Sequence, residues 1–186
     1  EKAIEHDPNF ARAFALLGTT HLMEATQFGG TSPAQSIKQA EGYAHKAISI
    51  SVASAQALMS GIRRIQGRWD EAVEYGEKAV VLNPNDPRVM LSLALTVHYL
   101  GRFDESIALT KRAMRMCPYY PAIYLSVLAP SYVIAGRYRE GIEACEQMLD
   151  RSRKGEINPL FAHIFLAEAY VGLDQLDKAR EQAEEV

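Results

Sequence analysis

The sequence has no long uninterrupted apolar run. No window reaches the roughly 18 apolar residues that a membrane-spanning helix requires. The N-terminus also lacks the basic stretch followed by an apolar run that marks a signal peptide. The 186 residues are 48% hydrophobic, which is typical of a globular chain. These features predict a soluble protein without a membrane partner, and we expect it to be cytoplasmic.

The chain also lacks an excess of charge of one sign. It has 20 Lys and Arg residues against 23 Asp and Glu residues, a formal net charge of -3. Binding to nucleic acid or to an anionic membrane surface depends on a strong basic field. The charge balance therefore gives no support to a nucleic-acid partner.

Cysteine is scarce, since Cys117 and Cys145 are the two in the sequence and stand in no metal or redox spacing. Free cysteine usually lies in a protein core. We expect two small buried side chains, with a disulfide or a reactive thiol as the alternative.

Residues that could support catalysis or bind a metal are dispersed along the chain. None of the five histidines has a second His or Cys three or four residues later, as metal sites on helices usually do. Gly29-Gly30 lacks the preceding strand and the following Gly-Lys-Ser/Thr of a phosphate-binding loop. No nucleophile pairs with a base. We therefore expect no catalytic residue, no metal site and no cofactor in this stretch. The histidines are His6, His21, His45, His98 and His163.

What the sequence does contain is a repeat. A six-residue phrase begins at Gly67 with the sequence Gly67-Arg68-Trp69-Asp70-Glu71-Ala72. It recurs 34 residues later as Gly101-Arg102-Phe103-Asp104-Glu105-Ser106, and then as Gly136-Arg137-Tyr138-Arg139-Glu140-Gly141. A weaker copy is Asp174-Gln175-Leu176-Asp177-Lys178-Ala179. Each copy opens a predicted helix with one apolar stripe, and each glycine follows a preceding helix, where a left-handed cap is favoured. We expect the aromatic at the helix start to be buried, so that replacing Trp69 by alanine costs about 3 to 5 kcal/mol. The preceding helices carry large apolar residues over 11–24, 53–66, 87–100, 121–135 and 158–172.

These residues resemble the tetratricopeptide repeat family, whose pattern runs from an aromatic through Leu-Gly and Tyr to Ala and Pro. Ser60 and Arg63 depart from the pattern, where a small residue and Tyr are expected, and Arg153 stands where Pro is expected. The resemblance implies an all-α solenoid, a right-handed superhelix of antiparallel helix pairs. Residues that match the pattern are Phe14, Leu17, Gly18, Pro84, Leu125, Leu128, Ala129, Tyr132, Leu166, Ala167 and Tyr170.

The repeats divide the chain into consecutive segments. We expect the end of one repeat over 1–10, repeats over 11–52, 53–86, 87–121 and 122–157, and a truncated repeat over 158–186. The first repeat carries an insertion over 24–39, in which Ser32 is the expected N-cap, Pro33 opens a helix running to about Ile50, and Gln35 completes a capping box. The insertion either extends that helix or presents Phe28 to a partner.

The resemblance implies a non-catalytic scaffold that binds a peptide or helix of another protein on the concave face formed by the inner helices. We expect an acidic part of the ligand near Arg12, Arg64 and Arg88, and an apolar part near Tyr99 and Ile134. The alternative is that the arginines are solvated or paired with acidic neighbours. The candidate contacts are Arg12, Arg64, Arg88, His98, Tyr99 and Ile134.

Three short phrases suggest a second function. Asp7-Pro8-Asn9-Phe10-Ala11, Asn83-Pro84-Asn85-Asp86 and Pro118-Tyr119-Tyr120-Pro121-Ala122 are similar to repeat arrays that follow the catalytic domain of some bacterial adenylate cyclases. The chain starts at Glu1, inside a predicted helix, so we expect it to be a piece of a longer protein. The alternative function is a regulatory or oligomerisation segment of such an enzyme, with self-association through the ends of the array.

Overall fold

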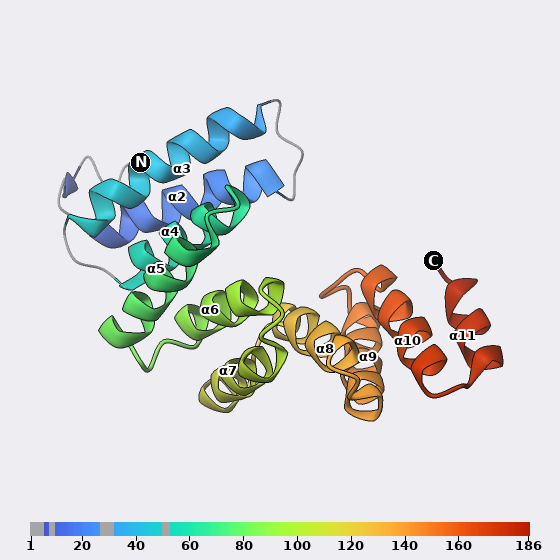
Figure 1. Ribbon diagram of the computed structural model, residues 1–186. Coiled ribbons are helices and arrows are strands. Elements are labelled where there is room, and N and C mark those ends of the chain that lie inside the picture. Colours follow the sequence, from blue (N-terminus) through green and yellow to red (C-terminus); the bar gives the residue numbers. More distant parts are fainter. Residues whose placement is uncertain (1–5, 8–9, 27–31, 50–52) are drawn as a thin grey trace. The chain divides into compact units, whose positions relative to one another are not determined.

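The computed structural model describes residues 6–7, 10–26, 32–49 and 53–186 (Figure 1). Every regular element within these residues is a helix, so the predicted all-α class is confirmed. In chain order the helices are α2 (Ala11–Thr26), α3 (Pro33–Ile48), α4 (Ala53–Ile65), α5 (Trp69–Leu82), α6 (Pro87–Tyr99), α7 (Phe103–Met116), the 3-10 helix η1 (Ala122–Tyr124), α8 (Leu125–Ile134), α9 (Tyr138–Arg153), α10 (Leu160–Gly172) and α11 (Leu176–Ala183).

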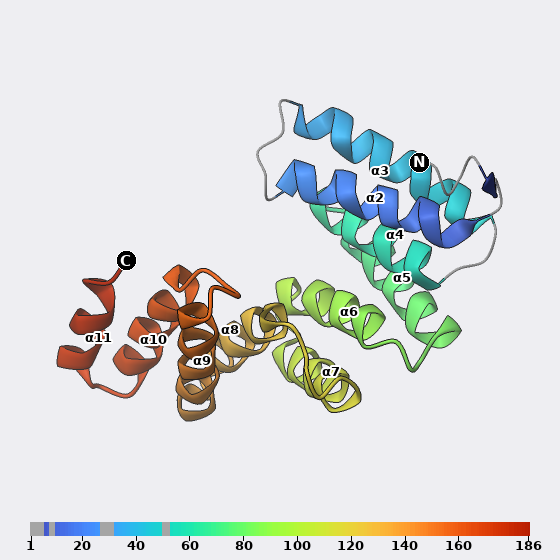
Figure 2. The ribbon, with the colours of Figure 1, turned by 180° about the vertical axis from the view of Figure 1, so that it is seen from behind.

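The chain forms two compact units, Glu1–Thr96 and Val97–Val186. Within the first, α2 packs against α3 and α4 against α5; within the second, α8 packs against α9 and α10 against α11. Figure 2 shows each of these pairs as an antiparallel hairpin. Helix pairs of this kind are the unit that the repeat period predicts.

The turns between paired helices use a left-handed residue. Gly67, Gly101 and Gly136 have φ angles of +72°, +76° and +74°. In each turn the backbone N–H of the next residue donates to the carbonyl five positions back, at 2.8 to 3.0 Å, which is the bond of a Schellman cap. Asp174 has φ 58° at the same place in the last pair. The weaker copy of the repeated phrase therefore makes the same turn without glycine.

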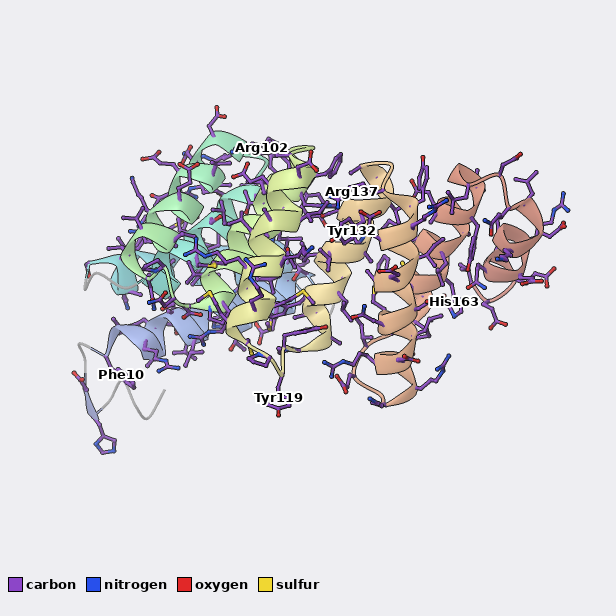
Figure 3. All side chains as sticks on the ribbon, turned by 90° about the horizontal axis from the view of Figure 1, so that it is seen from below. Phe10, Arg102, Tyr119, Tyr132, Arg137 and His163 are labelled. Carbon is purple, nitrogen blue, oxygen red and sulfur yellow. The ribbon has the colours of Figure 1, made fainter. Side chains whose placement is uncertain are left out.

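The residues after each glycine start the next helix. Acidic side chains lie in the first turn of α5, α7 and α9, where they interact favourably with the helix dipole. The arginine after the glycine pairs with a glutamate three residues later, as in Arg102–Glu105 at 2.6 Å and Arg137–Glu140 at 2.7 Å. Arg137 also lies over the Tyr132 ring, 4.8 Å from its centroid (Figure 3). The repeated phrase thus encodes a turn, a helix start and an ion pair.

Small residues allow the helices of the first unit to approach closely. Ala40 and Ala44 of α3 are fully buried. A Cβ atom at Gly18 of α2 would clash with Cδ2 of Leu58 in α4, so any larger residue there would force the Leu58 side chain to move. Ser60, one of the departures from the family pattern, is also fully buried, and its Oγ donates to the carbonyl of Ala72 at 2.7 Å.

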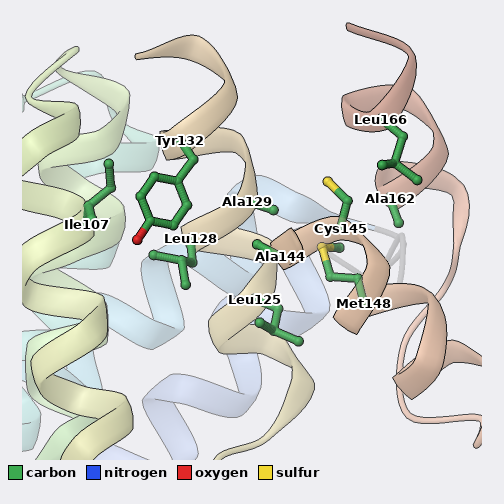
Figure 4. Packing of buried hydrophobic residues seen from close by; sticks show 10 residues of the cluster. All are labelled: Ile107, Leu125, Leu128, Ala129, Tyr132, Ala144, Cys145, Met148, Ala162 and Leu166. Atoms are coloured by element: carbon green, nitrogen blue, oxygen red, sulfur yellow. The ribbon is translucent and has the colours of Figure 1, made fainter. Parts of the chain in front are cut away.

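The core of the second unit gathers side chains from α8, α9 and α10 (Figure 4). Burial raises the pKa of the Cys145 thiol to about 12, so this thiol stays neutral and unreactive. Cys145 is therefore the buried side chain that we expected, whereas Cys117 is only partly buried, and both are free. The main contributors to this core are Leu125, Leu128, Tyr132, Met148 and Leu166.

Three local expectations need correction. Helix α3 begins at Pro33 as predicted but ends at Ile48, with Ser49 in the turn that follows. Ser32 makes no side-chain capping bond; its backbone carbonyl accepts instead from the N–H of Gln35 at 3.0 Å, so the capping box is wrong. Trp69 is 36% exposed. Because its ring is only partly removed from water, the loss expected for alanine there is smaller than for a core aromatic.

Candidate functional site

A pocket of about 560 Å³ lies in the first unit. Its walls come from α2, α4, the start of α6 and the turn between α5 and α6. Helices α2 and α4 pack against each other, and the Ser92 Oγ of α6 donates to the carbonyl of Ala57 in α4 at 3.2 Å. Three helices of the inner type therefore line one hollow.

Part of the pocket lining is small and apolar. Ala15, Ala57 and Gly61 line it together with Leu58. A Cβ atom at Gly61 would lie 3.2 Å from Cδ2 of Leu22, so a larger residue there would crowd the neighbouring helix. The small side chains of Ala15 and Ala57 and the missing side chain of Gly61 leave space in this part of the pocket.

Three arginines line the same pocket, each from a different helix. Arg12 is on α2, Arg64 on α4 and Arg88 on α6. Arg12 and Arg88 are exposed, and Arg64 is partly buried. Guanidinium groups form paired hydrogen bonds with carboxylates and phosphates, so this arrangement suits an anionic group.

Asp86 orients one of these arginines. It precedes Pro87, the first residue of α6, and its Oδ1 accepts from the backbone N–H of Arg88 at 2.9 Å. The Arg88 guanidinium donates to both carboxylate oxygens, at 3.1 and 2.7 Å. The hydrogen bonds from Arg88 lower the pKa of Asp86 below its ordinary 3.8, against the opposing effect of burial. The carboxylate therefore stays charged and fixes the Arg88 side chain at the pocket.

Ser54 adds a polar atom to the pocket wall. Its Oγ is buried and has no hydrogen-bond partner within the described residues. A buried hydroxyl without a partner costs free energy. A ligand oxygen or a water molecule in the pocket would satisfy it.

The structure brings together half of the predicted contacts. Arg12, Arg64 and Arg88 line one pocket, whereas His98, Tyr99 and Ile134 belong to the second unit. Tyr99 and Ile134 are exposed there. Phe28 lies outside the described residues. Of the predicted contacts, the three arginines are therefore the ones that line the pocket of the first unit.

His98 is held by its own unit. Its Nδ1 lies 2.8 Å from Oγ of Ser131, and the Ser131 hydroxyl donates to the carbonyl of Val127 at 2.7 Å. The imidazole packs edge-on against the rings of Tyr99 and Phe103, with centroids 5.4 and 5.5 Å away. Burial lowers the pKa of His98 below its ordinary 6.5. These contacts favour a packing role for a neutral His98 over direct contact with a partner.

Sequence reasoning missed the residues of the turn before α6. Asn83 and Asp86 line the pocket although neither is on an inner helix. The signal for Asp86 was available, because Asp followed by Pro is a typical start of a helix. The hydrogen bond between Asp86 and Arg88 could also have been predicted from the sequence, since the two residues are only two positions apart.

The described residues also bear on two other kinds of site. Among them, no group of three or more His, Cys, Asp or Glu side chains is placed to hold a metal ion. In the same part of the chain, no helix combines the length and the apolar character that crossing a membrane demands.

The paired helices and the pocket on the inner helices define a helical-repeat protein. Residues 63–121 match the model of the tetratricopeptide repeat family, and solved tetratricopeptide structures share the fold. This family is generally non-catalytic. No curated protein matches the chain in sequence.

Several solved structures are similar to this chain. PilF of Pseudomonas aeruginosa has 18% identity and a TM-score of 0.74, and the match covers 94% of this chain and 73% of PilF. The tetratricopeptide protein YrrB has 14% identity and a TM-score of 0.67, with 98% and 88% covered. MamA of Desulfovibrio magneticus RS-1 has 16% identity and a TM-score of 0.71, with 94% and 92% covered. At these identities the likeness shows the fold.

Proposed function

We propose that the protein is a non-catalytic scaffold that binds a peptide or helix of another protein, and that the pocket of the first unit receives an acidic group of that partner. The observation that carries this proposal is the meeting of Arg12, Arg64 and Arg88 at one pocket. A repeat that served only as a spacer would need no hollow lined by three arginines.

The chemistry of the pocket supports a peptide with mixed character. Each charge-assisted hydrogen bond contributes about 1.5 to 3 kcal/mol, and the small lining residues Ala15, Ala57 and Gly61 accommodate an apolar side chain beside the acidic group. Arg88 is held in place by Asp86, so less conformational entropy is lost when it engages a carboxylate. YrrB, which shares the fold, is described as having an unusual peptide-binding site, a precedent for peptide binding by such repeats.

The test begins with isolating the partner by pull-down with the full chain. Its affinity is then measured by calorimetry for Arg64→Glu and Arg88→Glu, with circular dichroism as the check on folding. We expect each reversal to weaken binding by at least about tenfold, which corresponds to about 1.4 kcal/mol. Arg139→Glu, on an exposed position of α9 outside the pocket, is the matched control and should leave affinity unchanged. Unchanged affinity in both pocket variants would move the site away from the pocket.

The alternative function is a regulatory or oligomerisation segment of a larger signalling enzyme such as a bacterial adenylate cyclase. It is supported by the phrases Asp7-Pro8-Asn9-Phe10-Ala11 and Pro118-Tyr119-Tyr120-Pro121-Ala122. Sequencing the native chain past both ends discriminates the two functions, because a cyclase domain would be visible at once.

A further inference from the structure

The pocket of the first unit has the size of a site for a small molecule. Its volume is about 560 Å³, and sites for small molecules usually have roughly 300 to 1,000 Å³. Its lining combines apolar residues with arginines and hydroxyl groups, as the lining of ligand pockets commonly does. The charges and the hydroxyl groups restrict the ligand that the pocket can hold.

The charged residues of the lining, three arginines and one aspartate, have a net charge of +2. The aspartate is Asp86, which is paired with Arg88. The hydrogen bonds from Arg88 hold the pKa of Asp86 below its ordinary 3.8, so this carboxylate stays charged at neutral pH. A ligand with a single carboxylate would balance half of the net charge. A phosphate monoester carries close to two negative charges at neutral pH and balances the net charge in full.

The lining also includes the N-terminal end of a helix. Ala53 and Ser54, the first two residues of α4, belong to it. The N-terminus of a helix carries a partial positive charge, and the backbone N–H groups of its first turn have no partner inside the helix. The first turn of α4 contains no acidic residue that would offset this charge. The helix end therefore adds to the attraction that the arginines exert on an anion.

The hydroxyl groups of the lining differ in whether they already donate a hydrogen bond. The Thr19 Oγ1 donates to the carbonyl of Ala15 at 2.9 Å, and the Ser92 Oγ donates to the carbonyl of Ala57 at 3.2 Å. The buried Ser54 Oγ has no hydrogen-bond partner within the described residues. The terminal oxygens of a phosphate ester are strong acceptors. One of them, placed at the N-terminus of α4, would accept from Ser54.

We propose that the pocket binds a small phosphate monoester. Arg12, Arg64 and the N-terminus of α4 hold the phosphoryl group, and the uncharged body of the ligand lies against the small apolar part of the lining. One phosphoryl group balances the charge of the lining, whereas a diphosphate or triphosphate would bring an excess of negative charge. The ligand is a soluble small molecule and not a segment of a protein, so this inference goes beyond the partner binding proposed above and is tested without a partner.

The test compares two probes that have the same body and different charges. At about pH 7.5 phenyl phosphate carries nearly two negative charges, and phenyl sulfate carries one. Each probe is titrated with the full chain, and binding is followed by the proton NMR signals of the phenyl ring. We expect phenyl phosphate to bind at least about tenfold more tightly than phenyl sulfate. Its affinity should fall toward that of the sulfate as the pH is lowered through about 6, because the ester then takes up a proton.

Variants of the lining show where the probe binds. Arg64→Gln should weaken binding of phenyl phosphate by about tenfold or more, and Arg12→Gln is the second variant in case the first does not fold by circular dichroism. Ser54→Ala should weaken binding severalfold. Thr19→Ala removes a hydroxyl that already donates within its own helix, and should leave binding unchanged. Arg139→Gln, at an exposed position of α9 outside the pocket, is the control for the loss of a positive charge elsewhere.

Several results would overturn the proposal. Equal affinity for phenyl phosphate and phenyl sulfate would show that the charge of the lining does not select the ligand. Unchanged affinity in both Arg64→Gln and Arg12→Gln would place the probe outside the pocket. A peptide with one phosphoserine that binds more than about a hundredfold more tightly than phenyl phosphate would make the ligand a modified protein. The calorimetry with the isolated protein partner is a separate measurement, so the two proposals can fail independently.

Discussion

Arg63 shows how a single residue can replace the contact that a family pattern leads one to expect. It stands where the pattern has Tyr, yet it is only 6% exposed. Its guanidinium donates to Glu41 of α3 at 2.6 Å and to Gln66 at 2.7 Å, and it lies 3.2 Å from a carboxylate oxygen of Glu71 in α5. Arg63 therefore links its own helix, α4, to α3 and α5 through ion pairs. The departure in the sequence is therefore compensated by ion pairs.

The first prediction concerns Glu41. Burial by itself would raise the pKa of this carboxyl, but the hydrogen bond and the charge of Arg63 outweigh burial and hold the pKa below its ordinary 4.5. The carboxylate therefore stabilises the fold above about pH 4.5, and this contribution is lost as the pH falls through the lowered pKa. Glu41→Gln should lower the free energy of unfolding by about 1 to 3 kcal/mol at neutral pH.

Urea unfolding followed by circular dichroism over a series of pH values checks this prediction. The difference between the two proteins should shrink in acid, because Glu41 becomes protonated in the unaltered chain as well. Glu77→Gln, at an exposed position of α5, is the control and should have little effect at any pH. A difference that persists undiminished in acid would show that the loss comes from packing and not from charge.

At the scale of the element, the turn after each inner helix depends on one left-handed residue. Glycine occupies that place at 67, 101 and 136, and Asp174 occupies it before α11 with φ 58°. A side chain costs free energy in this conformation because its Cβ approaches the neighbouring carbonyl oxygen. The last turn is therefore formed at a cost that the other three avoid.

The second prediction follows from this comparison. Asp174→Gly should stabilise the chain by about 1 kcal/mol, and Gly101→Asp should destabilise it by a similar amount. Midpoints of urea unfolding for both variants measure the two effects. Gly101→Asp should meet no steric obstacle, because a Cβ at position 101 would have nothing within 4 Å. The two variants should change the free energy of unfolding in opposite directions. A loss of stability in Asp174→Gly would mean that the aspartate side chain supports the turn.

At the scale of the whole molecule, stability should be distributed along the array. Each helix contacts mainly its neighbours in sequence, and the chain separates into two compact units with cores of their own. Repeat arrays of this kind approximate a one-dimensional sum of local stabilities and neighbour interfaces. Damage to one core should therefore weaken with distance along the chain.

The third prediction uses Leu125, a residue of the second core that is 1% exposed. Leu125→Ala should cost about 2 to 5 kcal/mol, the usual range for a buried leucine. In hydrogen exchange followed by mass spectrometry, peptides from α9 should lose more protection than peptides from α4, since α9 contributes to the same core. Equal loss of protection in both helices would indicate one cooperative unit.

Much of this architecture is local and could be predicted from the sequence. The glycines at 67, 101 and 136, the aromatic after each of them and the apolar stripes determined where helices begin and end. Such signals act over one or two helical turns, so they need no knowledge of distant contacts. The same period placed Arg12, Arg64 and Arg88 on inner helices. The division of the chain into repeats over the predicted boundaries stays a prediction.

The tertiary structure decided what depends on residues far apart in the chain. It gathered the three arginines at one pocket of the first unit and left Trp69 partly exposed. It also joined Arg63 of α4 to Glu41 of α3. The structure also shows that one apolar face of α10 is exposed. The sequence could not show this, since these apolar residues look like core residues there. Periodicity specifies which face of a helix a residue occupies. Only packing against other helices determines whether that face is covered by the protein, open to water or available to a partner.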